Sequence, residues 1–380
     1  MPFFSRFSFI KPVSFLIIPL ILTTACKEVN GKKKVKKETA KVSAKNKGAT
    51  PLLVKQPDSL KAPNGMVWVS GVHFTMGAQP DDKQALPREK PAHPVAVDGF
   101  FIDKTEVTNA EFRQFVEATG YKTLAERPID WEEMKKQLPP GTPKPADSVL
   151  QPGSLIFRDD VKQVQNLDDY SQWWEWKNGA DWKHPQGPDS NIEGKDDYPV
   201  VQVSYQDAVA YCKWANRQLP TEAQWEAAAH GKLTGGIYTW GDDTKMLPKE
   251  ANTWQGKFPV ENTDADGYDG IAPVKSYDPN SLGIYDMAGN VWELTNDWFN
   301  LNYYKDALAQ GEIKNPKGAS KAYNPGMPHQ QERIIKGGSY LCAASYCASY
   351  RISARMGNTM DSATDHTGFR TVASVGTLEE

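Results

Sequence analysis

The feature of this sequence that most constrains its fold is a long stretch without helical or strand periodicity. Residues 121–190 are rich in proline, glycine and tryptophan and contain the run WWEWKNGADWKHPQGPDS. The chain has 12 tryptophans in all, and such large side chains can hold irregular backbone in place. Loops of this length inside a compact domain tend to be functional. We therefore expect a loop-rich fold held together by aromatic side chains.

Short helices are predicted where a capping box precedes apolar positions at helical spacing. Cys212 falls on the apolar face of one such helix, which predicts a buried thiol rather than a metal ligand. Residues 64–77 alternate apolar and small residues around glycines, as the two strands of a hairpin do. The predicted capping boxes are Thr108 with Glu111, in a helix that stops at Gly120, Ser204 with Asp207, and Thr221 with Gln224.

The composition is that of a globular protein, with 39% hydrophobic and 24% charged residues. The net charge of -3 is too small for electrostatic capture of nucleic acid, so we expect no nucleic-acid partner. No internal repeat and no linker divides the sequence after residue 62. Residues 63–380 are therefore predicted to form one folded domain.

The first 25 residues have the features of a secretory signal peptide. Basic residues precede an apolar run that ends at Leu22 and is too short to span a membrane. The segment ends in Thr-Thr-Ala-Cys, which is similar to a bacterial lipobox and makes Cys26 the predicted site of lipidation. An ordinary signal peptide followed by an unmodified cysteine explains the same residues. We expect a protein that is lipid-anchored in the cell envelope and faces the periplasm or the cell surface.

Residues 26–62 are predicted to be a disordered tether. Nine lysines lie between Lys27 and Lys47 without any aromatic residue, so this part cannot bury enough surface to fold. The positive charge could rest on anionic lipid. A solvated spacer between the anchor and the domain is the favoured interpretation.

Two of the four cysteines, Cys342 and Cys347, lie close together near the C-terminus. Their Cys-x4-Cys spacing differs from the Cys-x2-Cys of zinc sites, and no second Cys or His pair lies nearby. In an oxidising compartment the spacing alone favours a local disulfide. Two thiolates without an imidazole would instead suit the soft ion Cu(I). Arg351 and Arg355, with small hydroxyl residues, favour a reactive pair, so the residues themselves leave both interpretations open.

Oxygen-rich loops suggest calcium. The run NTDADGYDG at residues 262–270 carries three aspartates beside glycines, but the twelfth position of an EF-hand loop would be Pro273, where a Glu is required. The EF-hand is therefore excluded. A solvated turn explains the same aspartates equally well. Asp286 and Glu293, around a glycine turn, form a second candidate.

The stretch IIKGGSYLCAASYCASYRISARMGNTMDSATDHTGFR resembles the C-terminal signature of the formylglycine-generating enzymes, the aerobic sulfatase-maturing oxidases. From Met66 onward the likeness is also carried by VDGFFIDKTEVTNAEF, YPVVQVSYQDAVAYCKWANRQLPTEAQWE and LGIYDMAGNVWELTNDW. The resemblance implies that residues 63–380 fold as an irregular mixed α/β domain with little regular secondary structure, related to C-type lectin folds.

The resemblance also implies an activity. It is the O2-dependent oxidation of the cysteine of a Cys-x-Pro-x-Arg segment, in an unfolded sulfatase polypeptide, to Cα-formylglycine. In this family two cysteines, matched by Cys342 and Cys347, hold Cu(I) linearly and the substrate thiolate joins as third ligand. Ser339 matches a residue that helps to place oxygen and substrate. Trp292 matches an aromatic residue that lines the site.

Two structural calcium sites are implied in the same way. Asp286 stands where the family usually has Asn, and an added carboxylate should not weaken a calcium site. The implied ligands are Asn252, Thr253, Asp266 and Tyr268 in the first site, and Asp286, Gly289, Val291 and Glu293 in the second.

Some positions depart from the family pattern. Ala343 stands where a His usually follows the first cysteine, which removes a polar neighbour of the site. Thr371 stands where some relatives carry a cysteine bonded to the position of Cys212, so Cys212 is predicted to be a free thiol. The lipid anchor also suits a second hypothesis, a non-catalytic surface lipoprotein that uses the same fold as a binding or cell-envelope scaffold module. The presence of both site cysteines favours the enzyme.

Overall fold

The computed structural model describes residues 51–233 and 235–379. These residues belong to one compact unit. The predicted signal peptide, Cys26 and the part of the predicted tether up to residue 50 lie outside the described residues. No helix in the described ranges has both the length and the apolar character needed to cross a membrane.

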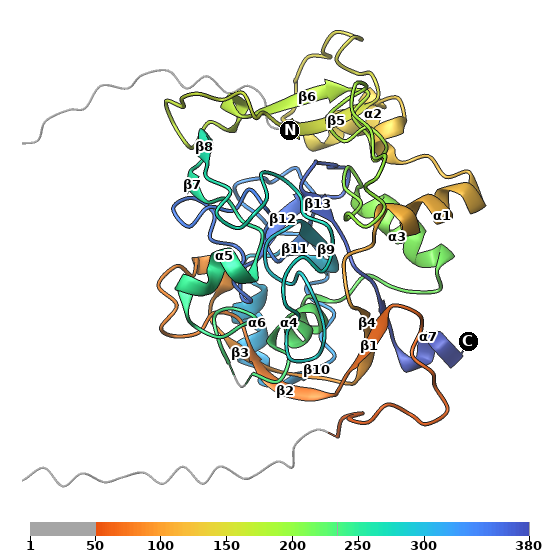
Figure 1. Ribbon diagram of the computed structural model, residues 1–380, viewed down its shortest axis with the longest axis vertical. Helices are drawn as coiled ribbons and strands as arrows, with labels where there is room; N and C mark the ends of the chain where they lie inside the picture. The colour runs from red at the N-terminus through yellow and green to blue at the C-terminus, as the bar shows by residue number, and fades with distance from the viewer. Residues whose placement is uncertain (1–50, 234, 380) are drawn as a thin grey trace, which may run out of the picture. The chain divides into compact units, whose positions relative to one another are not determined.

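Short elements and irregular segments alternate along the described chain (Figure 1), which confirms the mixed α/β class with little regular secondary structure. The helices are α1 Asn109–Thr119, α2 Trp131–Met134, α3 Tyr205–Trp214, α4 Glu222–His230, α5 Leu247–Glu250, α6 Tyr303–Gln310 and α7 Val375–Glu379. The strands are β1 Met66–Val69, β2 Val72–Met76, β3 His93–Val97, β4 Phe100–Asp103, β5 Gly153–Phe157, β6 Trp174–Asn178, β7 Gly256–Lys257, β8 Glu261–Asn262, β9 Trp292–Trp298, β10 Ile313–Lys314, β11 Glu332–Lys336, β12 Met356–Thr359, β13 Thr367–Gly368 and β14 Val372–Ala373.

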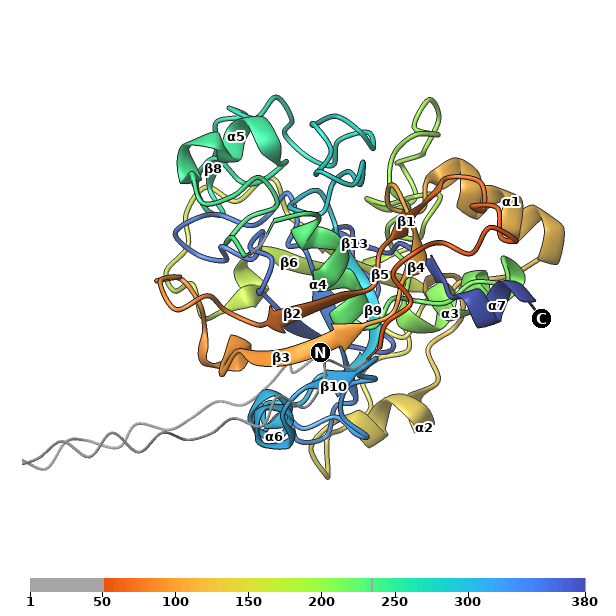
Figure 2. The ribbon, with the colours of Figure 1, turned by 90° about the horizontal axis from the view of Figure 1, so that it is seen from below.

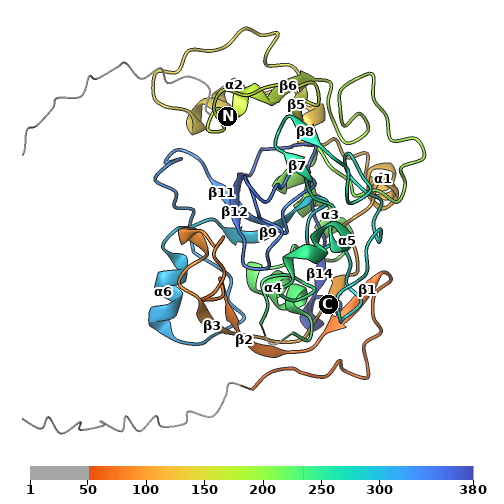
Figure 3. The same cartoon turned by 60° about the vertical axis from the view of Figure 1, so that its left-hand side comes forward.

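The sheets are small and join distant parts of the sequence. The largest one has the order β12-β11-β9-β13, and two three-stranded sheets have the orders β1-β4-β14 and β10-β3-β2. Helix α4 contacts β2 and β3 on one side and β9 and β11 on the other, so it fills the space between two sheets (Figure 3). Helix α6 packs on β3 at the outer side of the β10-β3-β2 sheet (Figure 2).

The three predicted capping boxes are all confirmed. At the start of α1 the Thr108 side chain accepts a hydrogen bond from the backbone N–H of Glu111, whose carboxylate accepts from the N–H of Thr108. The helix ends at Gly120, which has a φ of 65° and is therefore in the left-handed region that favours glycine. Ser204 and Thr221 cap α3 and α4 in the same way as Thr108 caps α1.

The predicted hairpin at residues 64–77 is wrong. Strand β1 pairs with β4, whereas β2 pairs with β3, so the two neighbouring strands lie in different sheets. The segment around Leu53 takes the place of a direct pairing between β1 and β2. The carbonyl of Leu53 accepts hydrogen bonds from the N–H groups of Gly71, between these strands, and of Gly99, before β4. A Cβ at Gly71 would lie 2.4 Å from that carbonyl oxygen.

Contacts of this segment also show that the folded part begins before residue 63, the start predicted from the sequence. The N–H of Leu53 donates to Asp98 at 2.7 Å, and the indole N–H of Trp68 donates to the carbonyl of Val54. Residues 51–62 thus pack on the domain, whereas the sequence placed them in the tether. The sequence did not indicate this packing, because residues 51–62 form no helix or strand and so show no periodic pattern of apolar residues.

Residues 121–190 are mostly irregular, as expected, but they also contain α2 and the two-stranded sheet β5-β6. Figures 1 and 3 show this hairpin on the side of the largest sheet opposite to β2 and β3. Aromatic side chains hold the hairpin to the C-terminal part of the chain. Phe157 and Trp173 from the hairpin form one buried cluster with Trp254, Phe258, Tyr340, Leu341 and Ala343.

Candidate active site

The structure brings the two C-terminal cysteines together in a tight loop that follows β11. Their sulfur atoms are 2.8 Å apart, and both thiols are free, as is that of Cys212. Cys342 is buried, whereas Cys347 is partly exposed. The loop is closed by hydrogen bonds from the N–H groups of Cys347 and Ala348 to the carbonyl of Ala343. The disulfide interpretation of the spacing therefore does not describe this structure, in which the pair is an adjacent dithiol.

The two thiols differ in acidity. The hydrogen bond with Cys342 lowers the pKa of the Cys347 thiol to about 7, and the Ser349 hydroxyl acts in the same direction. Burial raises the pKa of the Cys342 thiol well above its ordinary value. The pair therefore shares one proton near neutral pH, with Cys342 as donor and Cys347 as thiolate.

Arg351 and Arg355 do not act on the thiols as the sequence suggested, since carboxylates occupy both guanidinium groups. Arg351 binds Asp82 and Glu89 at 2.6 Å. Arg355 binds Glu222 at 2.6 Å, and both arginines are buried. These ion pairs fix the segment that follows the cysteines to Asp82, Glu89 and helix α4.

Arg88 is the cation whose charge acts on Cys347, and no pattern in the sequence singles this residue out. Its side chain forms no ion pair among the described residues, and its buried Nε has no hydrogen-bond partner. Burial lowers the pKa of this guanidinium, while its charge favours the thiolate of Cys347. Arg88 lies beside the cysteine loop because the adjacent Glu89 is held by Arg351.

Ser339 and Trp292 lie in the immediate surroundings of Cys342. The N–H of Ser339 donates to the sulfur of Cys342 at 3.4 Å, and its hydroxyl accepts from the N–H of Leu341. Trp292 is fully buried in the same apolar cluster as Cys342. The site residues from the sequence therefore come together, with Ser339 supplying a donor to sulfur through its backbone.

The side of the loop next to Cys347 carries an aromatic wall. Tyr346 stacks on Phe258 with ring centroids 4.6 Å apart, and it meets the edge of Trp173 at 6.0 Å. Gln84 donates to the carbonyl of Ala344 on the other side of the loop. The cysteine loop is thus contacted by the aromatic cluster through Tyr346 and by the segment of Gln84 through Ala344.

The donor set fits a soft monovalent ion such as Cu(I) in chemical type. Neither sulfur has an imidazole or a carboxylate among its hydrogen-bond partners. Within residues 51–233 and 235–379, no three His, Cys, Asp or Glu side chains converge as a metal site of those ligands would require. Because metal–thiolate bonds are about 2.3 Å long, the two sulfurs would have to separate to hold an ion in line.

The residues of the first implied calcium site also lie together. The carboxylate of Asp266 accepts from the N–H groups of Thr253 and Tyr268. The side-chain oxygen of the buried Asn252 has no hydrogen-bond partner, and burial raises the pKa of Asp266. An unpartnered buried oxygen next to a buried carboxylate is what a calcium ion would satisfy.

In the second implied site the structure adds a residue that the sequence did not indicate. Glu106 is buried, one of its oxygens is unpartnered, and burial together with the charge of Asp286 raises its pKa. Glu293, in contrast, has both oxygens bound, by Arg370 and by the indole N–H of Trp225. Three buried carboxylates therefore face one guanidinium. Glu106 and Asp286 also hydrogen-bond to each other, and the charge of Arg370 reaches both without forming an ion pair with either.

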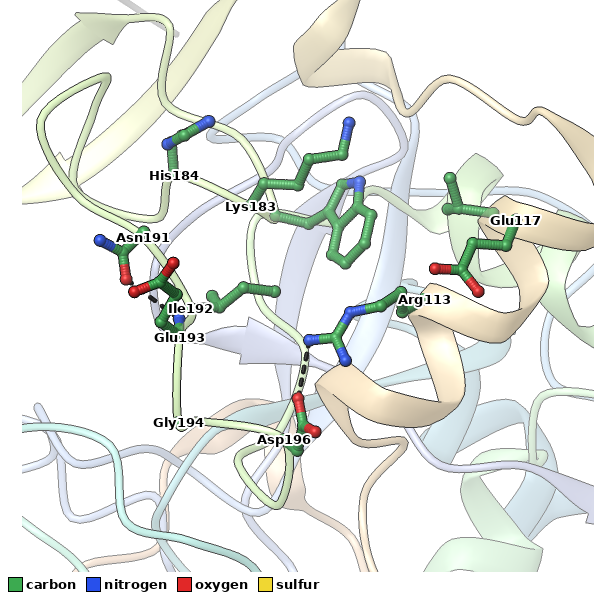
Figure 4. A pocket seen from close by; sticks show the side chains of 11 residues that line it. Arg113, Glu117, Lys183, His184, Asn191, Ile192, Glu193, Gly194 and Asp196 are labelled. Carbon is green, nitrogen blue, oxygen red and sulfur yellow. Dashed lines mark hydrogen bonds and ion pairs between the residues drawn. The ribbon is translucent and has the colours of Figure 1, made fainter.

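A separate surface hollow of about 430 Å³ lies between α1 and residues 182–196 (Figure 4). The ion pair between Arg113 and Asp196 crosses its edge at 2.7 Å. Its lining includes none of the site residues indicated by the sequence, so the hollow is distinct from the cysteine pair.

The chain is similar to known proteins over most of its length. A family model described as "Sulfatase-modifying factor enzyme 1-like domain" matches residues 52–375. The formylglycine-generating enzyme of Mycobacterium tuberculosis is 43% identical over 312 residues, which are 81% of this chain and 97% of that protein. A mouse protein named inactive C-alpha-formylglycine-generating enzyme 2 is 36% identical over 323 residues, 83% of this chain and 87% of its own. The solved structure of PvdO from Pseudomonas aeruginosa shares the fold, with a TM-score of 0.52 and 22% identity over 85% of this chain and all of that one.

Proposed function

This chain belongs to the family of sulfatase-modifying factor enzyme 1-like domains, to which the formylglycine-generating enzymes belong, and on that premise we propose that it oxidises a cysteine of sulfatase polypeptides to Cα-formylglycine. One observation carries the proposal. Cys342 and Cys347 are free thiols 2.8 Å apart, and one is open to the surface while the other is buried. A pure scaffold has little use for an accessible thiol of lowered pKa.

In the proposed reaction the substrate CH2–SH group loses two electrons and two protons and becomes a thioaldehyde, which water hydrolyses to the aldehyde and hydrogen sulfide. O2 takes up the two electrons and two protons and leaves as hydrogen peroxide, or as water where an external thiol supplies two further electrons and protons. Cu(I) held by Cys342 and Cys347 would supply the binding and reduction of O2. The target segment would be Cys-x-Pro-x-Arg in a sulfatase that has not yet folded.

The residues of the chain have separate tasks in this reaction. In the copper-free pair Cys347 carries the negative charge and Cys342 holds the shared proton, which would leave when both sulfurs bind Cu(I). The N–H of Ser339 stabilises negative charge on the sulfur of Cys342. Trp292 and the aromatic cluster exclude water from the buried sulfur, which strengthens these interactions.

A second function is a binding or scaffold role without catalysis. It is favoured by the 36% identity with a protein named inactive and by the replacement of a polar residue with Ala343 next to Cys342. In that case the cysteine pair would be dispensable for the role of the protein.

The test uses the chain without residues 1–50, loaded with Cu(I), and a peptide that contains Cys-x-Pro-x-Arg in air. Mass spectrometry follows the conversion of the peptide cysteine to the aldehyde. We expect turnover that needs copper and that is lost in both Cys342→Ser and Cys347→Ser. The matched control Cys212→Ser, which changes a buried thiol outside the site, should keep it. A folded, copper-binding protein without turnover would favour the scaffold.

We also propose two calcium ions as structural cofactors. The unpartnered oxygens of Asn252 and Glu106 and the excess of buried carboxylates support them. Chelation should then lower the melting temperature of the domain without removing copper from the thiols.

Finally, we propose a lipid anchor at Cys26 that places the domain in the cell envelope, facing the periplasm or the surface. The lipobox-like sequence is its support. Metabolic labelling with a radioactive fatty acid should mark the wild-type chain, and a Cys26→Ser variant should be unlabelled and leave the membrane fraction.

A further inference from the structure

A buried carboxylate outside the site described above has only half of its hydrogen-bonding capacity met. Asp365 has no measurable exposure, and its Oδ2 accepts from the N–H of Phe157 at 2.9 Å and from the Gln186 side chain at 2.8 Å. Its Oδ1 is buried without a partner. Such atoms are rare in folded proteins and call for an explanation.

A second unpartnered oxygen belongs to Gln202, which is also fully buried. Its side-chain nitrogen donates to the carbonyls of Pro185 at 2.7 Å and Leu155 at 3.4 Å, and this fixes which end of the amide is oxygen. The oxygen itself has no partner. Gln202 also has a φ of 60°, a left-handed conformation that costs energy for a residue other than glycine.

The same segments of the chain hold both side chains. Residues 155–157 and 185–186 supply partners to Gln202 and to Asp365 alike. The backbone N–H of Gln202 also donates to the carbonyl of Thr364, the residue before Asp365. Asp365 and Gln202 are therefore neighbours in one buried region, and each has one oxygen without a partner.

The charge of Asp365 has no counter-ion among the described residues. The groups that act on it are the Phe157 N–H and the Gln186 amide, both neutral, and burial raises its pKa to about 6. At neutral pH it is therefore a buried anion next to a buried carbonyl oxygen. Such an arrangement is costly unless a cation or a proton compensates it.

We propose that Asp365 and Gln202 bind a hard cation, Ca²⁺ or Na⁺, in a site separate from the residues that family resemblance assigns to calcium. Carboxylate and amide oxygens are the ligands that such ions take. The cation would join β5 to the segment before β13. Since Phe157 packs in the same aromatic cluster as Leu341 and Ala343, the site would also hold the wall beside the cysteine loop in place.

Two other occupants explain the same atoms, a water that donates to both oxygens and a proton on Asp365 that is shared with Gln202. Substitutions separate them. Asp365→Asn removes the charge and offers an N–H to Gln202, so the fold is kept without a cation. Gln202→Glu adds a second carboxylate, which strengthens a cation site but makes a water or proton site less stable. Asp361→Asn, which changes an exposed carboxylate four positions earlier, is the matched control.

The experiment compares these variants as purified full-length chains. Metal content is measured by mass spectrometry after dialysis, and melting temperature is measured with chelator, with Ca²⁺, and in sodium against choline chloride. We expect Asp365→Asn to lose one equivalent of calcium, or the sodium-dependent part of its melting temperature, relative to wild type and Asp361→Asn. Gln202→Glu also loses the N–H donors to Pro185 and Leu155, so it should melt below wild type without the cation, and its melting temperature should rise more than that of wild type when the cation is added.

Unchanged metal content and unchanged cation dependence in Asp365→Asn would overturn the proposal in favour of water or a proton. So would a Gln202→Glu variant whose melting temperature rises no more with the cation than that of wild type. Should Asp365→Asn fail to fold, the change in the melting temperature of Gln202→Glu on addition of the cation, compared with that of wild type, decides between a cation and the other two occupants. None of these readings depends on sulfatase-directed activity.

Discussion

Arg370 binds Glu293 through two hydrogen bonds of 2.6 Å in a part of the domain that has no access to solvent. Glu293 lies on β9 in the largest sheet, and Arg370 lies two residues after β13, which pairs with it. This ion pair therefore fixes the segment after β13 to β9, the strand that also carries Trp292.

Removal of Arg370 should be severely destabilising. Arg370→Ala leaves a buried carboxylate without its counter-ion, and we expect a loss of about 3–5 kcal/mol in the free energy of unfolding. Denaturant unfolding would measure it. The control is Arg113→Ala, which breaks an exposed pair with Asp196 and should change little. Equal losses in the free energy of unfolding of both variants would mean that the buried ion pair contributes no more to stability than the exposed one.

The cysteines should react with iodoacetamide in a fixed order in the copper-free protein. Cys347 is partly exposed with a pKa of about 7, whereas Cys212 and Cys342 are buried with raised pKa values. We expect the rate at Cys347 to rise with pH through about 7 and to level off above 8. Cys342→Ala removes the hydrogen bond that lowers this pKa, so the midpoint should move to higher pH. Peptide mass spectrometry reports both.

Asp297 should make stability fall as pH rises. Burial, together with the charge of Glu222, raises its pKa from 3.8 to about 7. A raised folded pKa means that its stabilising effect is complete below about pH 4 and is lost as pH rises through 7. Each tenfold change in proton affinity is worth about 1.4 kcal/mol, so the loss by pH 8 is up to about 4 kcal/mol.

Asp297→Asn tests this directly, because its amide oxygen can still accept from the N–H of Glu222. The variant should lose clearly less stability between pH 5 and pH 8 than the wild type, and the remaining loss should come from other buried carboxylates such as Asp103 and Asp365, whose pKa values are raised to about 6. A wild type and variant with parallel pH profiles would show that Asp297 is not the titrating group.

Glu106 should govern the response to calcium. Glu106→Gln removes one of three buried carboxylates that share one guanidinium. We expect this variant to melt higher than wild type in chelator and to gain less from added Ca²⁺. Glu117→Gln, at an exposed position of α1, serves as the control and should behave as wild type. Differential scanning calorimetry with and without Ca²⁺ distinguishes them.

Gly289 should be intolerant of any side chain. It has a φ of 75°, and a Cβ there would lie 2.1 Å from the carbonyl oxygen of Asn252. Gly283 has a similar φ of 77° but open space around it. Gly283→Ala therefore carries only the backbone cost of about 1 kcal/mol, and Gly289→Ala should cost clearly more. Comparable melting temperatures would contradict this.

Local signals in the sequence predicted the helices well, because a capping box such as Thr108 with Glu111 places both partners within four residues. The cysteine pair was equally visible as a local motif. The partners of Arg351 were not, since Asp82 and Glu89 lie more than 250 positions away. The role of Glu106 was hidden in the same way, because only the folded chain brings it to Asp286.

The strand pairing failed for a related reason. The sequence pattern of Met66–Val69 and Val72–Met76 is that of a hairpin. In the structure the two strands diverge where the carbonyl of Leu53 accepts hydrogen bonds from the N–H groups of Gly71 and Gly99. A single acceptor from a segment without regular structure leaves no periodic trace in the sequence.

The position of β14 has a consequence for how the chain is made. Val372 and Ala373 pair with β4, near the start of the domain, and complete a sheet that holds β1 as well. That sheet stays unfinished until residues 372 and 373 have left the ribosome, because local contacts alone cannot close it. During synthesis β4 therefore waits with one edge unpaired for a strand made about 270 positions later, and pairing with another chain is the hazard of that interval.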